Sequence, residues 1–417
     1  MSISRAEKKR AQPRMAHAKT VMRLFIGLFL LFVPAHQALA ETKVTDLRLG
    51  ITDERTRLVL ELSGRVSFDI MTLDNPRRIV IDMPSVSWPS AGKPASGGLV
   101  AGLRYGQFTA DKSRLVIDAA GPVKVANSFL LNPASGFPHR LVVDLVKTDK
   151  KSFAAQVRAE RQAKLSTRRA APPAAPIPEA RPRRANVKPV IVIDAGHGGV
   201  DPGASGRRAR EKDVTLTFAR ELARQLRAEK NYTVYLTRNR DIYIPLRQRV
   251  SIARKHNADL FISIHADAIK RRNVRGMSIY TLSETASDKE AAALARKENQ
   301  SDIIAGIDFN DQPREVADIL IDLAQRETKN LSVKFANLVV NKARGKTRLL
   351  ERTHRFAGFR VLKAPDVPSV LIELGFLTNR NDENQLVSAS WRRKMAGALV
   401  DSIDSFFSGG KLASTGP

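Results

Sequence analysis

Val190-Ile-Val-Ile-Asp-Ala-Gly-His-Gly-Gly199 carries an apolar run directly into a histidine between glycines. Two later apolar runs also end in a polar side chain, the first in His265 (Asp259-Leu-Phe-Ile-Ser-Ile-His265) and the second in Glu373 (Val367-Pro-Ser-Val-Leu-Ile-Glu373). Short apolar runs rich in β-branched residues are typical of buried strands. In an open α/β sheet, side chains beyond the carboxyl ends of adjacent strands converge on one crevice. We therefore expect two imidazoles and a carboxylate to meet at one edge of a sheet.

The sequence around these runs, residues 189–410, alternates strand and helix patterns. Apolar residues recur at helical spacing over 214–226, a strand is predicted over 233–237, and a further helix over 244–256 tolerates Pro245 near its start. Alternation of this kind predicts an α/β domain with a mainly parallel sheet covered by helices.

The predicted strand ends offer the ligands of a zinc site. A hydrolytic zinc needs about three protein ligands, an open position and a nearby carboxylate that accepts a proton from water. His197 and His265 are candidate ligands, and Glu373 is the best candidate for the general base. Glu211 lies between a Gly/Arg loop and the first predicted helix, from where it can swing back over the strand ends as a further ligand.

Each of these residues, taken alone, is more often structural than functional, so the prediction depends on their joint occurrence. The other histidines, including His256 and His354, lack this context and are expected to be structural or solvated. The compact zinc motif His-Glu-x-x-His does not occur in the sequence.

Residues 41–150 are predicted to form a small all-β domain. Apolar strand patterns at 57–62, 78–82, 113–118 and 140–144 are separated by turn-forming residues. The last three share a sequence pattern of Arg, three apolar residues and Asp: Arg78-Ile-Val-Ile-Asp82, Arg114-Leu-Val-Ile-Asp118 and Arg140-Leu-Val-Val-Asp144. We interpret them as pseudo-repeated strands of a sandwich, although alternating Arg and Asp on solvated faces would give the same pattern. No catalytic cluster is evident in this part.

Residues 151–188, rich in Ala, Pro and Arg, are predicted to be an extended linker. The arginines could bind an anionic surface. The simpler alternative is that the segment is a soluble spacer whose charges repel one another.

The amino terminus and the charge indicate the compartment. A basic stretch, an apolar run over 24–33 and Ala38-Leu-Ala40 predict a secretory signal, residues 1–40, cleaved after Ala40; an uncleaved anchor is the alternative. The formal net charge of +28 predicts attraction to a polyanion such as nucleic acid, anionic lipid or a wall polymer. Export argues against nucleic acid, and cleavage argues against a stable membrane anchor. The absence of cysteine excludes thiolate zinc ligands and disulfides.

Four segments resemble the zinc-dependent N-acetylmuramoyl-L-alanine amidases of bacterial cell-wall turnover: Val192-Ile-Asp-Ala-Gly-His-Gly-Gly with the Asp-Pro-Gly-Ala that follows, Glu211-Lys-Asp, Ser263-Ile-His-Ala-Asp and Ile372-Glu-Leu-Gly-Phe-Leu-Thr-Asn. The resemblance implies that His197, Glu211 and His265 bind Zn²⁺ and that Glu373 is the catalytic carboxylate. The implied reaction is hydrolysis of the amide between the lactyl group of muramic acid and L-alanine of the stem peptide. Asp267 is a candidate for a residue that supports the metal ligands without binding the metal itself.

The β domain resembles the domain that targets periplasmic division amidases of Gram-negative bacteria to septal peptidoglycan. An insertion at about 284–328, with predicted helices over 288–299 and 315–326, resembles their regulatory segment. By that resemblance a helix covers the zinc cleft, supplies a carboxylate to the metal and is displaced by a LytM-domain activator. Glu298 is the first candidate for this inhibitory ligand and Glu290 the second; the alternative is that both lie on a solvated helix face.

Two other functions fit the same residues. One is a zinc carboxypeptidase or endopeptidase that cuts within stem peptides. The other is a non-catalytic wall-binding protein, against which the presence of all four site residues argues. An apolar stripe at Val316, Ile319, Leu320 and Leu323 could pack on the core or present the activator site.

Overall fold

The structure is a computed structural model that describes residues 41–88, 96–168, 188–307 and 320–411. The chain from Thr42 onward forms one compact unit. The predicted export signal, residues 1–40, lies outside the described residues. Within the described ranges, no helix is both long enough and apolar enough to span a membrane.

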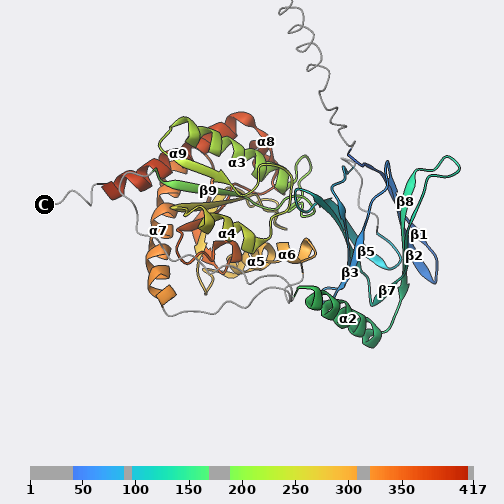
Figure 1. Ribbon diagram of the computed structural model, residues 1–417. Helices are drawn as coiled ribbons and strands as arrows, with labels where there is room; N and C mark the ends of the chain where they lie inside the picture. Colours follow the sequence, from blue (N-terminus) through green and yellow to red (C-terminus); the bar gives the residue numbers. More distant parts are fainter. Residues whose placement is uncertain (1–40, 89–95, 169–187, 308–319, 412–417) are drawn as a thin grey trace, which may run out of the picture. The chain divides into compact units, whose positions relative to one another are not determined.

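Two four-stranded antiparallel sheets form the amino-terminal domain, which confirms the predicted β-sandwich. The first sheet has the order β1-β2-β8-β7 and the second β3-β4-β6-β5 (Figure 1). Their strands are β1 Val44–Ile51, β2 Arg55–Leu62, β3 Asp69–Leu73, β4 Arg78–Pro84, β5 Val100–Gln107, β6 Lys112–Ala119, β7 Val123–Leu131 and β8 His139–Lys147. The four predicted strands are the central ones, β2, β4, β6 and β8. Edge strands such as β7 expose more of their residues and therefore have a weaker apolar pattern.

The prediction of an extended linker is wrong for its first part. Residues Lys150–Arg168 form helix α2, in which the Phe153 side chain is 2% exposed. The Glu160 carboxylate accepts a 2.7 Å hydrogen bond from the backbone N–H of Thr72 in β3. The prolines that argue for an extended chain begin only at Pro172, so they leave this helix intact. Residues 169–187 lie outside the described part.

A six-stranded sheet of order β10-β9-β11-β14-β12-β13 forms the carboxyl-terminal domain. β10, β9, β11 and β14 are parallel, whereas β12 runs antiparallel to β14 and parallel to β13, so the sheet is mainly parallel as predicted. Its strands are β9 Val190–Ala195, β10 Thr233–Leu236, β11 Leu260–His265, β12 Met277–Leu282, β13 Leu349–Ala357 and β14 Ser369–Glu373.

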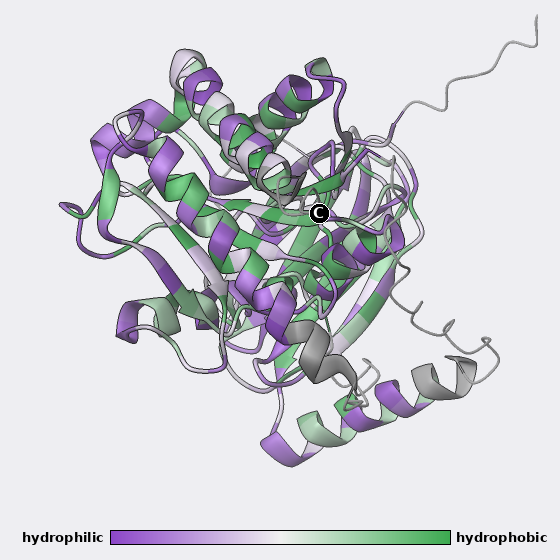
Figure 2. Ribbon diagram, turned by 90° about the vertical axis from the view of Figure 1, so that its left-hand side faces the viewer, coloured by the Kyte–Doolittle hydropathy of each residue, from purple (hydrophilic) through white to green (hydrophobic). Residues whose placement is uncertain are grey.

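Helices cover both faces of this sheet. They are α3 Glu211–Ala228, α4 Leu246–Lys255, α5 Lys289–Glu298, α6 Ser301–Ile304, α7 Leu320–Ala343, η2 Arg360–Leu362, α8 Arg380–Val387 and α9 Ala389–Lys411. α3, α7 and α9 pack on one face through a cluster that includes Phe218, Phe335 and Leu399. α4, α5 and η2 pack on the other face around Phe261 and Leu371. Figure 2 shows hydrophobic residues gathered along the strands and hydrophilic ones on the outer sides of the helices.

The predicted insertion is helical, with different boundaries. α5 matches the helix predicted over 288–299. α7 begins at Leu320 and continues to Ala343, well beyond the predicted end at residue 328. Residues 308–319 and the side chains of Leu320 and Leu323 lie outside the described part, and so does the predicted apolar stripe.

Candidate metal centre and its covering segment

The sheet register brings two predicted site residues side by side. His265 at the end of β11 is paired with Glu373 at the end of the parallel strand β14. His197 follows β9, the neighbour of β11 on its other side, and its backbone φ of 58° turns the chain back over the strand ends. Adjacent parallel strands therefore carry all three side chains to one edge, as predicted.

Two glycines allow the site to be this compact. A Cβ atom at Gly196 would lie 2.5 Å from Cε1 of His265. At Gly203, where φ is +64°, a Cβ atom would lie 2.7 Å from both Glu211 Oε2 and His197 Cδ2. Both positions need glycine because the side chains of the site pass directly over the backbone.

Four side chains converge here, all of them buried. Glu211 Oε1 lies 3.1 Å from His197 Nε2 and 3.1 Å from His265 Nδ1. Glu298 Oε2 lies 3.2 Å from each of the same two nitrogens. Glu211 follows the Gly/Arg loop as predicted and is itself the first residue of α3.

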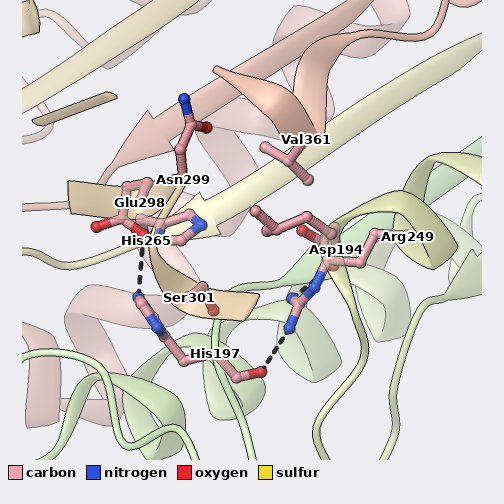
Figure 3. A pocket seen from close by; sticks show the side chains of 9 residues that line it. Asp194, His197, Arg249, His265, Glu298, Asn299, Ser301 and Val361 are labelled. Carbon is pink, nitrogen blue, oxygen red and sulfur yellow. Dashed lines mark hydrogen bonds and ion pairs between the residues drawn. The ribbon is translucent and has the colours of Figure 1, made fainter. Parts of the chain in front are cut away.

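The donor set fits a metal ion. His197, His265 and Glu298 each offer one atom within 4.8 Å of the other two, and Figure 3 shows these side chains pointing toward one another. Ligand atoms of a tetrahedral zinc are separated by about 3.3 Å, close to the distances above. His197 Nε2 is buried without a hydrogen-bond partner among the described residues, as a nitrogen that offers its lone pair to a metal would be. The adjoining cavity of about 10 Å³ is comparable with the smallest that hold one water.

The electrostatics also favours a cation. Burial disfavours charge on His197, but the carboxylates of Glu211 and Asp201 outweigh it and raise the pKa of the imidazole well above its usual value. Burial likewise opposes ionisation of Glu298, yet the imidazoles of His197 and His265 lower its pKa. The carboxylates of Glu211, Asp201 and Glu298 therefore stabilise a positive charge between the two imidazoles.

Asp201 is a site residue that the sequence reasoning missed. Its Oδ2 lies 2.9 Å from His197 Nδ1, so it fixes the ring with Nε2 turned toward the other ligands. Asp201 could have been recognised in the sequence, because it follows His197 by four residues and belongs to the Asp-Pro-Gly-Ala segment that carries the family resemblance.

Glu373 differs from the other carboxylates. Its Oε2 accepts a 2.9 Å hydrogen bond from the backbone N–H of Asp267, and its Oε1 is buried with no hydrogen-bond partner in the described ranges. Burial raises the pKa of Glu373 well above its usual value, and the charges of Asp267 and Glu211 raise it further. A carboxylate with these properties is suited to gaining and losing a proton.

The structure separates the two candidate inhibitory glutamates. Glu298 ends α5 over the strand ends and contacts both imidazoles. The Glu290 side chain is 60% exposed and pairs with Arg271 at 3.1 Å and Arg355 at 3.3 Å. The prediction of Glu290 as the second candidate for the inhibitory ligand is therefore wrong, because Glu290 lies in the first turn of α5 on the side that faces solvent.

Polar contacts hold the residues around Glu298 against the site. Lys297 forms an ion pair with Asp267, which is also adjacent to Glu373. The Ser301 hydroxyl donates to Asp201 Oδ2. Asp302 Oδ1 accepts hydrogen bonds from the Tyr243 hydroxyl at 2.7 Å and the Leu246 N–H at 3.0 Å. We call residues 289–306 the covering segment.

The remaining histidines match expectation where they are described. His256 stacks on Tyr235 with ring centroids 3.7 Å apart, and the His354 ring contacts Thr281. Neither lies at the strand ends.

Known proteins resemble both domains. A family model described as N-acetylmuramoyl-L-alanine amidase matches residues 191–405, and an AMIN domain model matches residues 46–145. The amidase AmiC of Escherichia coli is 35% identical over 394 residues, covering 92% of this chain and 94% of the relative. The amidase AmiC of Neisseria meningitidis is 34% identical over 404 residues, covering 93% and 96%. A solved structure of AmiC2 from Nostoc punctiforme covers 54% of this chain with 26% identity and a TM-score of 0.39. The chain belongs to the N-acetylmuramoyl-L-alanine amidase family and carries an AMIN domain ahead of its amidase domain.

Proposed function

We propose that the protein is a zinc-dependent N-acetylmuramoyl-L-alanine amidase of the periplasm that is inhibited by its own covering segment. The observation that carries this proposal is the convergence of Glu211 and Glu298 on the same two imidazole nitrogens, beside the buried Glu373. The substrate would be the amide between muramic acid and L-alanine of peptidoglycan, cut during septal splitting and daughter-cell separation.

His197, Glu211 and His265 would hold the zinc. Bound zinc would lower the pKa of a water molecule and polarise the substrate carbonyl. Glu373 would accept the proton of the attacking water and pass it to the leaving amine of L-alanine. Asp201 would keep the His197 ring in place, and Asp267 would orient Glu373 through its backbone N–H.

Glu298 would act as the inhibitory ligand. A catalytic zinc keeps one position open for water, whereas two imidazoles and two carboxylates make a closed, four-ligand site. Displacement of the covering segment would open that position. A LytM-domain activator is the partner that we propose for this step.

The predicted export signal and the AMIN domain support a periplasmic location in a Gram-negative cell. The AMIN domain would direct the enzyme to septal peptidoglycan. The high positive charge would favour an anionic wall polymer over a neutral one.

Two measurements on the full-length protein test the reaction: zinc content, and mass analysis of the products from purified sacculi. We expect about one zinc per chain, with glycan strands freed of intact stem peptides. Trimmed peptides would instead indicate a carboxypeptidase or endopeptidase. Bound zinc without any hydrolysis, even after displacement of Glu298, would indicate a non-catalytic wall-binding protein.

A further inference from the structure

We propose that the sheet β3-β4-β6-β5 of the AMIN domain is the docking surface for the end of the covering segment, and that this contact helps to keep Glu298 at the two imidazoles. The inference rests on the autoinhibition proposed above. It gives the AMIN domain a second task, the restraint of the enzyme to which it is joined.

Arginines of this sheet donate to backbone carbonyls at the end of α6. Arg114 Nη1 lies 3.1 Å from the carbonyl oxygen of Ala305 and 3.0 Å from that of Gly306. Arg78 donates to the carbonyl of Ile303, and Arg104 Nε lies 3.3 Å from the carbonyl of Ile304. The last carbonyls of a helix have no intrahelical partner and carry partial negative charge, so guanidinium groups satisfy them well.

Arg114 is fixed in the orientation that this contact needs. The Asp82 carboxylate on β4 binds it through two hydrogen bonds of 2.6 and 2.8 Å, and its guanidinium lies 3.5 Å from the centre of the Phe108 ring. Because Asp82 already holds one edge of the Arg114 guanidinium, the side chain loses little conformational entropy when the other edge binds carbonyl oxygens.

The other AMIN sheet provides an internal comparison. Arg57 and Asp144 form the same two-bond pair, at 2.7 and 2.8 Å, on β2 and β8. The Arg57 side chain is 36% exposed, whereas that of Arg114 is 7% exposed. Similar Arg–Asp pairs therefore occur in both sheets, but only Arg114 of these two bonds the covering segment.

Apolar packing completes the docking surface. Val80 and Val116 of the sheet form a buried cluster with Ala305, Tyr243 and Val200. At Gly306, where φ is +72°, a Cβ atom would lie 2.9 Å from Val80 Cγ2 and 3.1 Å from Val116 Cγ2. Glycine is needed here both for its backbone conformation and for this close approach.

The docked residues are mechanically close to the inhibitory ligand. Ser301 and Asp302, which bond Asp201 and Tyr243, lie between Glu298 and the carbonyls that the arginines hold. A force that lifts residues 303–306 from the sheet therefore acts on Glu298 through only a few residues. By linkage, any ligand that moves the AMIN sheet off this segment would favour opening of the site.

Two pairs of full-length variants test the proposal, one from each side of the contact. Gly306→Ala disturbs the segment, and Gly345→Ala is its control because Gly345 has φ +75° and no heavy atom within 4 Å of the added Cβ. Arg114→Lys keeps a positive charge beside Asp82 but removes the planar guanidinium that bonds Asp82 and the carbonyls at once. Arg57→Lys is the matched change in the other sheet. Glu298→Ala reports on autoinhibition itself, and thermal melting verifies that each variant is folded.

The test has two readouts. One is basal stem-peptide release by the zinc-loaded proteins, and the other is amide hydrogen exchange over residues 289–307 in the zinc-free proteins. We expect Gly306→Ala and Arg114→Lys each to raise basal release about fivefold over their controls, as the loss of one or two net hydrogen bonds predicts, and to speed exchange in the segment. If Glu298→Ala is activated while both docking variants match their controls in rate and exchange, the docking proposal is wrong and autoinhibition stands. If Glu298→Ala is not activated, autoinhibition is wrong, and so is the inhibitory role of the docking contact.

Discussion

The strand ends and the covering segment bring side chains to the same point, but the two regions are held in place by different forces. His265 and Glu373 end strands whose residues are buried on both faces, and the pairing of β11 with β14 fixes their separation. Glu298 comes from α5, a helix of 10 residues whose buried apolar side chains are only Ala291, Leu294 and Ala295. So short a helix is marginal by itself, and much of its attachment is polar. We therefore propose that the strand-end half of the site is permanent and that the half formed by the covering segment is displaceable.

The largest expected effect lies on the permanent side. Glu373→Gln removes the proposed base but preserves the shape of the site, so stem-peptide release should fall by about 10²–10⁴-fold. Zinc content should stay unchanged, because Glu373 is not among the proposed ligands. Unchanged turnover would assign the base to another residue.

Removal of zinc should affect the two regions unequally. A ligand at about a hundred times its Kd stabilises the folded state by about 2.7 kcal/mol, so a chelator should lower the melting temperature by several degrees. Amide exchange should rise sharply in α5, since Glu298 would lose its attachment to the metal, and change little in β11. Equal increases in both regions would contradict the distinction between them.

Lys297→Met should loosen the displaceable side alone. Burial opposes charge on Lys297, but the carboxylates of Glu211 and Asp267 raise its pKa, and the ion pair with Asp267 helps to hold α5. The Lys297 side chain is 42% exposed, so we expect only about a threefold rise in basal release. Lys289→Met, at the exposed start of the same helix, is the control and should leave the rate unchanged.

The smallest effect concerns stability and pH, within the permanent region. A hydrogen bond from Arg224 lowers the pKa of Glu221 on α3 to about 2. A lowered folded-state pKa stabilises the protein above the unfolded value of 4.5, and this contribution disappears as the pH falls from there toward 2. Arg224 is 62% exposed, so Glu221→Gln should cost about 0.5 kcal/mol at pH 7 and nothing below pH 2. Denaturant unfolding at both pH values measures the difference, and basal release should not change.

Sequence patterns predict where the strand-end residues lie, because these residues follow apolar runs. His265 and Glu373 end strands that are recognisable from composition, and strand adjacency then brings them together. Composition does not predict helix α2, because the prolines after residue 171 favour an extended chain over all of residues 151–188. The Arg and Asp residues of β4 and β6 lie on the strand face of Val80 and Val116, outside the sandwich core. Their pattern is ambiguous in the sequence because it does not indicate the segment that covers this face.

The displaceable half was predicted less completely, although a signal was present. Ala291, Leu294, Ala295 and Glu298 follow helical spacing on one face of α5, so Glu298 extends the buried stripe. Glu290 does not lie on that stripe, and the structure places it in solvent. Periodicity could therefore have favoured Glu298 over Glu290, whereas the contacts of Ser301 and Asp302 depend on tertiary structure.

The most direct test of a displaceable ligand compares Glu298→Ala with Glu290→Ala in the zinc-loaded, full-length protein without any activator. Both changes remove a glutamate from α5, but only Glu298 contacts His197 and His265. We predict that Glu298→Ala releases stem peptides from sacculi at least about tenfold faster than the unmodified protein, with Glu290→Ala unchanged. Equal rates for all three proteins, at equal zinc content, would contradict the account.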